Sequence, residues 1–186
     1  MGRRRWTRYA VALLLDSEVD MTEPQAPALT FICRLQVSLG EPVDFGVNAL
    51  GRRRYVPITG GTVSGPYLSG RVLPGGGDWQ TIRPDGVVDL RAQYAFELDC
   101  GTYVEMDNSG LRYAPPDVAA ELAAGRAVSP SDYYFQTCAR LNVAAGPYDW
   151  LTRTLFVAGA ERHADQVDVE LFALGLLSCD KREGQS

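Results

Sequence analysis

The sequence has very few of the residues on which common enzyme mechanisms depend. Its 186 residues include one histidine, His163, and one lysine, Lys181. A Ser-His-Asp triad needs a histidine beside a nucleophile, and the chain has no G-x-S-x-G segment, so acyl transfer of that kind is excluded. The four cysteines lie far apart, form no C-x-x-C pair and, with a single histidine, match no zinc-ligand spacing. The sequence therefore predicts no metal and no cofactor.

Long apolar runs are also missing, which bears on location. The run from Tyr9 to Leu15 follows a basic start, but it is too short to span a bilayer and is followed by acidic residues without a signal-cleavage motif. We expect residues 1–28 to be a disordered extension or a misassigned start, with Met21 as the true first residue. The cysteine number is even, so disulfides stay open. In a chain of this size, however, we expect buried free thiols and a cytoplasmic location.

Composition and charge indicate one folded domain without nucleic-acid or membrane partners. Hydrophobic residues make up 46% of the chain and charged residues 22%, which is ordinary for a globular protein. The net charge of -5 would repel phosphate backbones. We expect a single domain over residues 29–180, followed by a tail over 181–186.

Short alternating runs separated by Gly, Pro, Asn and Asp predict an antiparallel all-β fold from Leu29 onward. LTFICRLQVSLG alternates from Phe31 to Ser38, as a half-buried strand does. One helix is expected over about Asp117 to Ala124, where two prolines precede good helix formers and Gly125 can end the helix. The remaining runs predict strands: RRRYVPITGG, YLSGRVLPG, GVVDL, RAQYAFELD joined through Asp99-Cys100-Gly101 to TYVEMDNSGLRYA, then DYYFQTCARLNVA, WLTRTLFVAGAERHA and QVDVELFALGL.

The number of strands favours a closed barrel. About eight to ten short strands in one domain are typical of a sandwich or a barrel. Few charges protect the strand edges, and closure is the arrangement that removes exposed edges.

Three segments with matching order and spacing carry a family resemblance. They are ITGGTVSGPYLSGRVLPGGGDWQ, DGVVDLRAQYAFELDCGTYVEMDNSGLR and YYFQTCARLNVAAGPYDWLTRTLFVAG. Across about Leu29 to Leu174 the chain resembles the family called domain of unknown function 3237, or uncharacterised protein family 0311. Gly77 replaces the alanine usual before Asp-Trp, and Thr152 stands where the family often has asparagine. The resemblance implies a lipocalin-like β-barrel and no agreed reaction.

A bend made of three glycines forms the first candidate site. In VLPGGGDWQ the glycines at 75–77 precede Asp78 and Trp79. Glycine adopts positive φ without steric cost, so the backbone can turn sharply and approach another surface closely. Asp78 would then face a ligand beside the flat wall of Trp79. The alternative is a turn in which Asp78 accepts backbone N–H bonds and Trp79 closes the barrel end.

The strand LRAQYAFELD carries two different faces. Period two places Arg91 and Glu97 on a polar face and Tyr94 on the apolar one. In a polar lumen, a poorly hydrated Glu97 would have a raised pKa and serve as an acid or base. In the alternative, this polar face is simply solvated.

Tyrosines and arginines gather in the following segments. SGLRYA and DYYFQTCAR place Arg112 among tyrosines, and arginine can hold a carboxylate in a bidentate pair. GPYDWL adds a tyrosine and a tryptophan two positions apart, which would form one wall of a pocket. Core filling is the alternative. The candidate ligand-binding residues are Trp79, Arg91, Tyr94, Tyr134, Thr137, Arg140, Tyr148 and Trp150.

The sequence thus favours a barrel that binds a small, partly apolar or aromatic molecule in its lumen. In the enzyme version, Asp78 or Glu97 transfers a proton and Arg112 stabilises negative charge, in a cyclisation, isomerisation or hydration. In the binding version the same groups only orient a ligand. A third hypothesis is a structural barrel that forms a homodimer through an edge strand.

Overall fold

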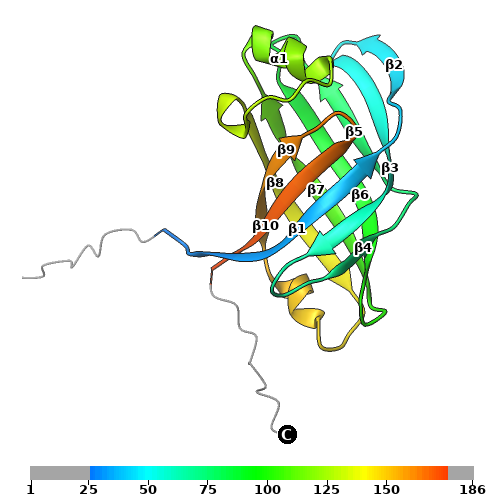
Figure 1. The fold of residues 1–186 in the computed structure, drawn as a ribbon, viewed down its shortest axis with the longest axis vertical. Coiled ribbons are helices and arrows are strands. Elements are labelled where there is room, and N and C mark those ends of the chain that lie inside the picture. The colour runs from blue at the N-terminus through cyan, green and yellow to red at the C-terminus, as the bar shows by residue number, and fades with distance from the viewer. Residues whose placement is uncertain (1–25, 176–186) are drawn as a thin grey trace, which may run out of the picture.

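The computed structural model describes residues 26–175, which form a single β-barrel (Figure 1). Most of the expected extension over 1–28, and the whole expected tail over 181–186, lie outside the described residues. No helix in the described range is long and apolar enough to cross a membrane.

Ten strands, one α-helix and two 3-10 helices follow one another within residues 26–175. In order they are β1 (Leu29–Leu39), β2 (Val43–Asn48), β3 (Gly51–Ser64), β4 (Gly70–Val72), β5 (Gly77–Ile82), β6 (Val88–Leu98), β7 (Tyr103–Tyr113), α1 (Pro116–Ala123), η1 (Pro130–Asp132), β8 (Tyr134–Val143), η2 (Asp149–Arg153), β9 (Phe156–Arg162) and β10 (Gln166–Leu174).

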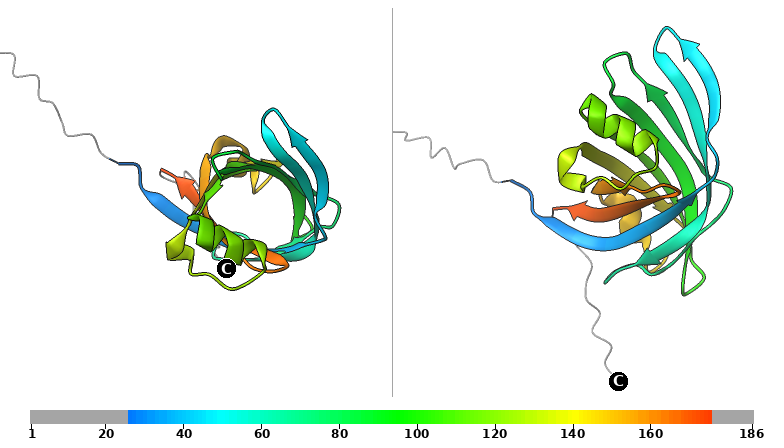
Figure 2. Two further views of the ribbon diagram at one scale, coloured as in Figure 1. Left: turned by 90° about the horizontal axis from the view of Figure 1, so that it is seen from above. Right: turned by 45° about the horizontal axis from the view of Figure 1, so that its top comes forward.

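The strands close into an antiparallel barrel, as predicted. The order runs from β1 through β10, β9, β8, β7 and β6 to β3, and β1 also pairs with β3, which removes the edge. The short strands β4 and β5 both lie between β3 and β6, so they share one position in the wall. The view from above shows the resulting ring (Figure 2).

Several segments differ from the sequence prediction. Strand β5 was not predicted, because its preceding glycines indicate a bend, and the two strands predicted in GVVDL and RAQYAFELD form the single strand β6. The strand β2 was not predicted, because its Asp, Gly and Asn have low strand propensity; it pairs with β3 alone and is broken by a bulge between Asp44 and Gly46. The predicted strand from Trp150 onward was wrong in its first part. There the chain forms η2, and strand β9 begins only at Phe156. The predicted helix is confirmed, over Pro116–Ala123, and Gly125 follows it with φ 70°.

The two ends of the barrel are filled differently. At the η2 end, side chains such as Phe96, Leu151 and Phe156 are completely buried and form a solid core. At the α1 end, a smaller apolar cluster of Leu90, Leu122, Tyr133 and Phe135 lies near the helix. Polar interior side chains occur between these two clusters, so a site inside the barrel has a solid floor on the η2 side.

The cysteines do not all follow the prediction of buried thiols. Cys33 is buried, whereas Cys100 and Cys138 are exposed because they lie in a turn and on the outer face of β8, and all three are free. Cys179 falls outside the described residues.

Candidate functional site

Four polar side chains from four strands meet inside the barrel. By period two, β5, β6, β7 and β8 point Asp78, Tyr94, Asn108 and Thr137 inward, where they line one cavity of about 40 Å³ with apolar walls. We call these four residues the luminal cluster.

Each member of the luminal cluster has a buried polar atom without a hydrogen-bond partner in the structure. These atoms are Asp78 Oδ1, the Tyr94 hydroxyl, Asn108 Oδ1 and Thr137 Oγ1. No other buried side-chain N or O atom in residues 26–175 lacks a partner. A buried group without a partner costs about 1–3 kcal/mol. Four such groups around one cavity therefore lower the stability of the ligand-free protein. This is typical of a binding site in which the ligand supplies the missing hydrogen-bond partners.

Asp78 is held in place from one side only. Gln80, two positions along β5, donates from its amide to Asp78 Oδ2, and its Oε1 accepts a hydrogen bond of 2.6 Å from Arg54 Nε. Burial raises the pKa of Asp78 above its usual range, although the Gln80 hydrogen bond and the nearby arginines act in the opposite direction. The carboxyl therefore has one fixed oxygen and one unpartnered oxygen, and it keeps its proton to higher pH than an exposed aspartate does.

Three arginines lie next to Asp78. Arg54, Arg112 and Arg162 line a second cavity of about 30 Å³ together with Asp78, Gln80 and apolar residues. We call them the arginine trio. Burial lowers the pKa of Arg112 to about 10, which leaves it cationic at neutral pH, and its guanidinium lies 5.7 Å from the centre of the Phe135 ring. Because both cavities are lined by Asp78 and Phe135, the trio adjoins the luminal cluster.

The glycine bend before Asp78 is required by three different constraints. Gly75 has φ +109°, which an L side chain rarely adopts. A Cβ on Gly76 would lie 2.4 Å from Tyr94 Cβ, and one on Gly77 would lie 1.9 Å from Tyr55 Cε2. The bend thus brings the chain against β6 before β5 begins, and the alternation of β5 then turns Asp78 inward.

Several predicted site residues lie on the outside of the barrel. Glu97 forms an ion pair of 2.5 Å with Arg71, and Arg91 forms one of 2.5 Å with Asp107. The polar face of β6 is therefore the solvated one. Trp79 is 44% exposed, stacks on Phe45 and packs against the tilted ring of Tyr55, so it neither faces the lumen nor closes the barrel end.

The remaining predicted residues also lie away from the luminal cluster. Tyr134 and Arg140 are exposed on the outer face of β8, the face opposite to Thr137. Tyr148 directly precedes η2 and Trp150 lies within it. The centroid of the Trp150 ring is 6.2 Å from that of Phe156, at the end of the barrel that the core fills. Of the predicted residues, the structure brings together Asp78, Tyr94, Arg112 and Thr137.

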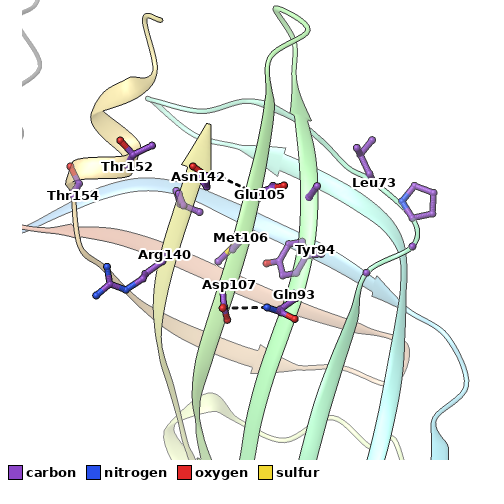
Figure 3. Close-up of a pocket in the computed structure, with 15 residues that line it drawn as sticks. Leu73, Gln93, Tyr94, Glu105, Met106, Asp107, Arg140, Asn142, Thr152 and Thr154 are labelled. Atoms are coloured by element: carbon purple, nitrogen blue, oxygen red, sulfur yellow. Dashed lines mark hydrogen bonds between the residues drawn. The ribbon is translucent and has the colours of Figure 1, made fainter. Parts of the chain in front are cut away.

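The outer surface carries a larger groove, of about 760 Å³, across β6, β7 and β8 (Figure 3). Two pairs of its polar side chains are hydrogen-bonded to each other: Gln93 Nε2 donates to Asp107 Oδ2 at 3.3 Å, and Asn142 Nδ2 donates to Glu105 Oε2 at 2.9 Å (Figure 3). Thr152, at one side of this groove, donates to the Asp149 carbonyl at 2.7 Å instead of facing the lumen. Of the four residues with an unpartnered buried atom, only Tyr94 also lines this groove, whereas all four line the interior cavity, so we place the candidate site inside the barrel.

Sequence reasoning did not identify Arg54, Gln80, Asn108 or Arg162. The period-two signal was present: Gln80 follows Asp78 by two, and Asn108 shares a face with Met106 and Arg112. No group of His, Cys, Asp and Glu side chains in residues 26–175 is arranged to hold a metal ion.

Comparisons with known proteins agree on a family and a fold. The family described as "Protein of unknown function (DUF3237)" matches residues 27–174. A UPF0311 protein of Bradyrhizobium diazoefficiens is 40% identical over 141 residues, which is 76% of this chain and 92% of that protein. The crystal structure of a conserved protein of unknown function from Rhodopseudomonas palustris is 36% identical with a TM-score of 0.79, covering 81% of this chain and 99% of the other. An enzyme from Penicillium herquei shares the fold at 17% identity and a TM-score of 0.62, over 82% of this chain and 98% of that one.

Proposed function

Since the chain belongs to the DUF3237 family of proteins of unknown function, we propose its role from its own interior: the barrel binds a small, partly apolar organic molecule in its lumen, and Asp78 acts on that molecule as an acid or base. The observation that supports this most is the set of four unpartnered polar atoms around one cavity. Apolar walls with a few converging polar groups are the usual composition of small-molecule sites.

Entry of a ligand requires side chains to move. The cavities of about 40 and 30 Å³ are smaller than an aromatic molecule, so they describe the closed site. Arg112 is the side chain best able to move, because its guanidinium has no hydrogen bond and no ion pair with another described residue, only the ring of Phe135 beside it. Its displacement would connect the two cavities.

The chemistry that suits this site is proton transfer next to a carbonyl group. The ionised Asp78 would take a proton from the carbon beside the carbonyl, and the electron pair of that C–H bond would pass to the carbonyl oxygen. Arg112 or the Tyr94 hydroxyl would stabilise the resulting enolate. Return of the proton to a different atom gives isomerisation. In a cyclisation, the protonated Asp78 would give its proton to one carbon of a C=C bond, an internal hydroxyl oxygen would bond to the other carbon, and the hydroxyl proton would return to the Asp78 carboxylate.

A panel of compounds tests binding. Aromatic carboxylic acids and polyketide-like phenols are screened by thermal shift, and the best compound is measured by isothermal titration calorimetry. For a phenol, Asp78→Asn should weaken binding by about tenfold or more, because the phenol hydroxyl loses a charged hydrogen-bond acceptor. Asp89→Asn is the matched control, since Asp89 is exposed on the neighbouring strand β6. Equal affinities of the two variants would remove Asp78 from the site.

Proton transfer is tested without knowledge of the natural reaction. In D₂O, 2-tetralone loses the NMR signal of its α-hydrogens as deuterium replaces them. The wild-type protein and Asp89→Asn should accelerate this loss over buffer, and Asp78→Asn should not. Binding without any acceleration by the wild type would favour the alternative, a barrel that only carries its ligand.

The strand β2 supports a second candidate role, a homodimer. β2 pairs with β3 alone among the described strands, all six of its residues are exposed, and Val43 and Val47 are apolar. An unprotected edge of this kind can pair with a second copy. Light scattering after size exclusion should then give twice the chain mass, and Val47→Lys should restore the monomer.

A further inference from the structure

The arginine trio carries an unbalanced charge at the site proposed above. Of the nine described arginines outside the trio, seven form an ion pair with a carboxylate, while Arg53 and Arg140 do not; the seven are Arg34, Arg52, Arg71, Arg83, Arg91, Arg126 and Arg153. The trio forms no such pair with any described residue, although its side chains are half-buried around the cavity, where a charge has less water to stabilise it than on the open surface.

The surroundings of the trio supply little negative charge. Asp44 attracts Arg54 and Asp165 attracts Arg162, but neither carboxylate forms an ion pair with them. Arg54 donates to the neutral Gln80 at 2.6 Å, and Arg162 donates to the carbonyl oxygens of His163 and Gln166. Arg112 has only the face of the Phe135 ring. Asp78 is the one carboxyl that lines the same cavity, and it is shared by three cations.

The cations also act on one another. Arg54 and Arg162 each lower the pKa of Arg112, which is the expected effect of like charges in a poorly hydrated space. Buried charges in folded proteins are normally paired, because an unpaired one has a large desolvation cost. Three unpaired cations around one cavity therefore indicate a site that is completed by an anion from outside the chain.

We infer that the ligand of the lumen is an organic carboxylate, whose anionic group binds between Arg54, Arg112 and Arg162 while its uncharged part reaches the luminal cluster. Guanidinium groups match a carboxylate in bidentate geometry. The cavity between the arginines is only about 30 Å³, so a planar carboxylate fits it better than the larger tetrahedral phosphate group. Leu39, Phe135 and Val167 line both cavities and provide an apolar wall between the two polar ends. This inference rests on the proposed luminal binding and adds the chemical class of the ligand.

Matched acid and amide probes test the charge separately from the shape. Binding of 2-naphthoate and of its isosteric neutral amide, 2-naphthamide, is measured by calorimetry on the wild-type protein at low salt. The acid should bind at least tenfold more tightly than the amide, and this ratio should fall as salt is added. Arg112→Gln and Arg162→Gln should each bring the ratio close to one.

Arg140→Gln is the control, because Arg140 lies on the outer face of β8 and lines the outer groove. This variant should leave the ratio of acid to amide affinity unchanged. A ratio close to one in Arg140→Gln would overturn the inference, because the anion would then bind in the outer groove. Equal binding of acid and amide to the wild type would overturn the carboxylate assignment and leave luminal binding intact. Absence of binding by both probes and by the whole compound panel would contradict the proposed function itself. The wild-type ratio needs no variant, so the test holds even if a substitution prevents folding.

Discussion

Replacing Thr137 with valine should make the ligand-free protein more stable. Thr137 is 4% exposed, and its Oγ1 has no hydrogen-bond partner. Valine has nearly the same volume, so no cavity is created, and the variant loses the desolvation cost of an unpartnered hydroxyl, about 1–3 kcal/mol. For a domain of this size each kcal/mol corresponds to roughly 2–4 °C in Tm.

The free energy of unfolding is measured by urea denaturation, with Thr62→Val as the control. Thr62 is exposed, and its hydroxyl donates to Gln36 Oε1 at 3.2 Å, so its replacement should lower stability slightly or not at all. If Thr137→Val is as stable as the wild type or less stable, the hydroxyl is already satisfied in the free protein. The reasoning that links unpartnered groups to a ligand would then be refuted.

Three further predictions concern other parts of the site and its surroundings. Gly76→Ala should lower the free energy of unfolding by several kcal/mol in the same urea assay, because the new Cβ would lie 2.6 Å from a backbone oxygen of β6 that cannot move aside; an unchanged midpoint would contradict this packing. Burial raises the pKa of the Cys33 thiol to about 12, so it should stay unreactive to Ellman's reagent at pH 8 until the protein unfolds, whereas the exposed Cys100 should react at once. Since the pKa of Asp78 is raised in the folded state, its contribution to stability is complete below the ordinary aspartate pKa and is lost as pH rises through the folded value. As the pH rises from below the ordinary aspartate pKa through the folded value, Tm should fall less in Asp78→Asn than in the wild type. In Asp89→Asn the fall in Tm should be the same as in the wild type.

The sequence predicts the barrel well because strand alternation and turn residues act locally. The β6–β7 hairpin through Gly101, the helix before Gly125 and the polar and apolar faces of β6 all follow from spacing within ten residues. For β6 the sequence left open which face is inside, and the structure resolves this because cross-strand ion pairs hold Arg91 and Glu97 on the surface.

The candidate site was only partly predictable because it depends on register between strands. In the run RRRY, three consecutive arginines alternate in direction, and only pairing with β5, which sets Arg54 opposite Gln80, shows that this arginine faces inward. The aromatic run in DYYF favours Tyr134 as a site residue, but Tyr134 faces outward and Thr137 lies on the opposite, inner face of the same strand. The unpartnered atoms themselves belong to four different strands, so no local pattern could show that they meet.

Asp78 and Trp79 are consecutive in β5, so an acid inside the barrel and an indole outside it share one stretch of backbone. The indole stacks against Phe45 with ring centroids 5.8 Å apart and an interplanar angle of 12°. Any shift of this strand when the lumen fills will change that stacking, and with it the tryptophan emission. The protein thus carries a fluorescent reporter of its own occupancy, placed in the solvent where a quencher such as iodide can reach it.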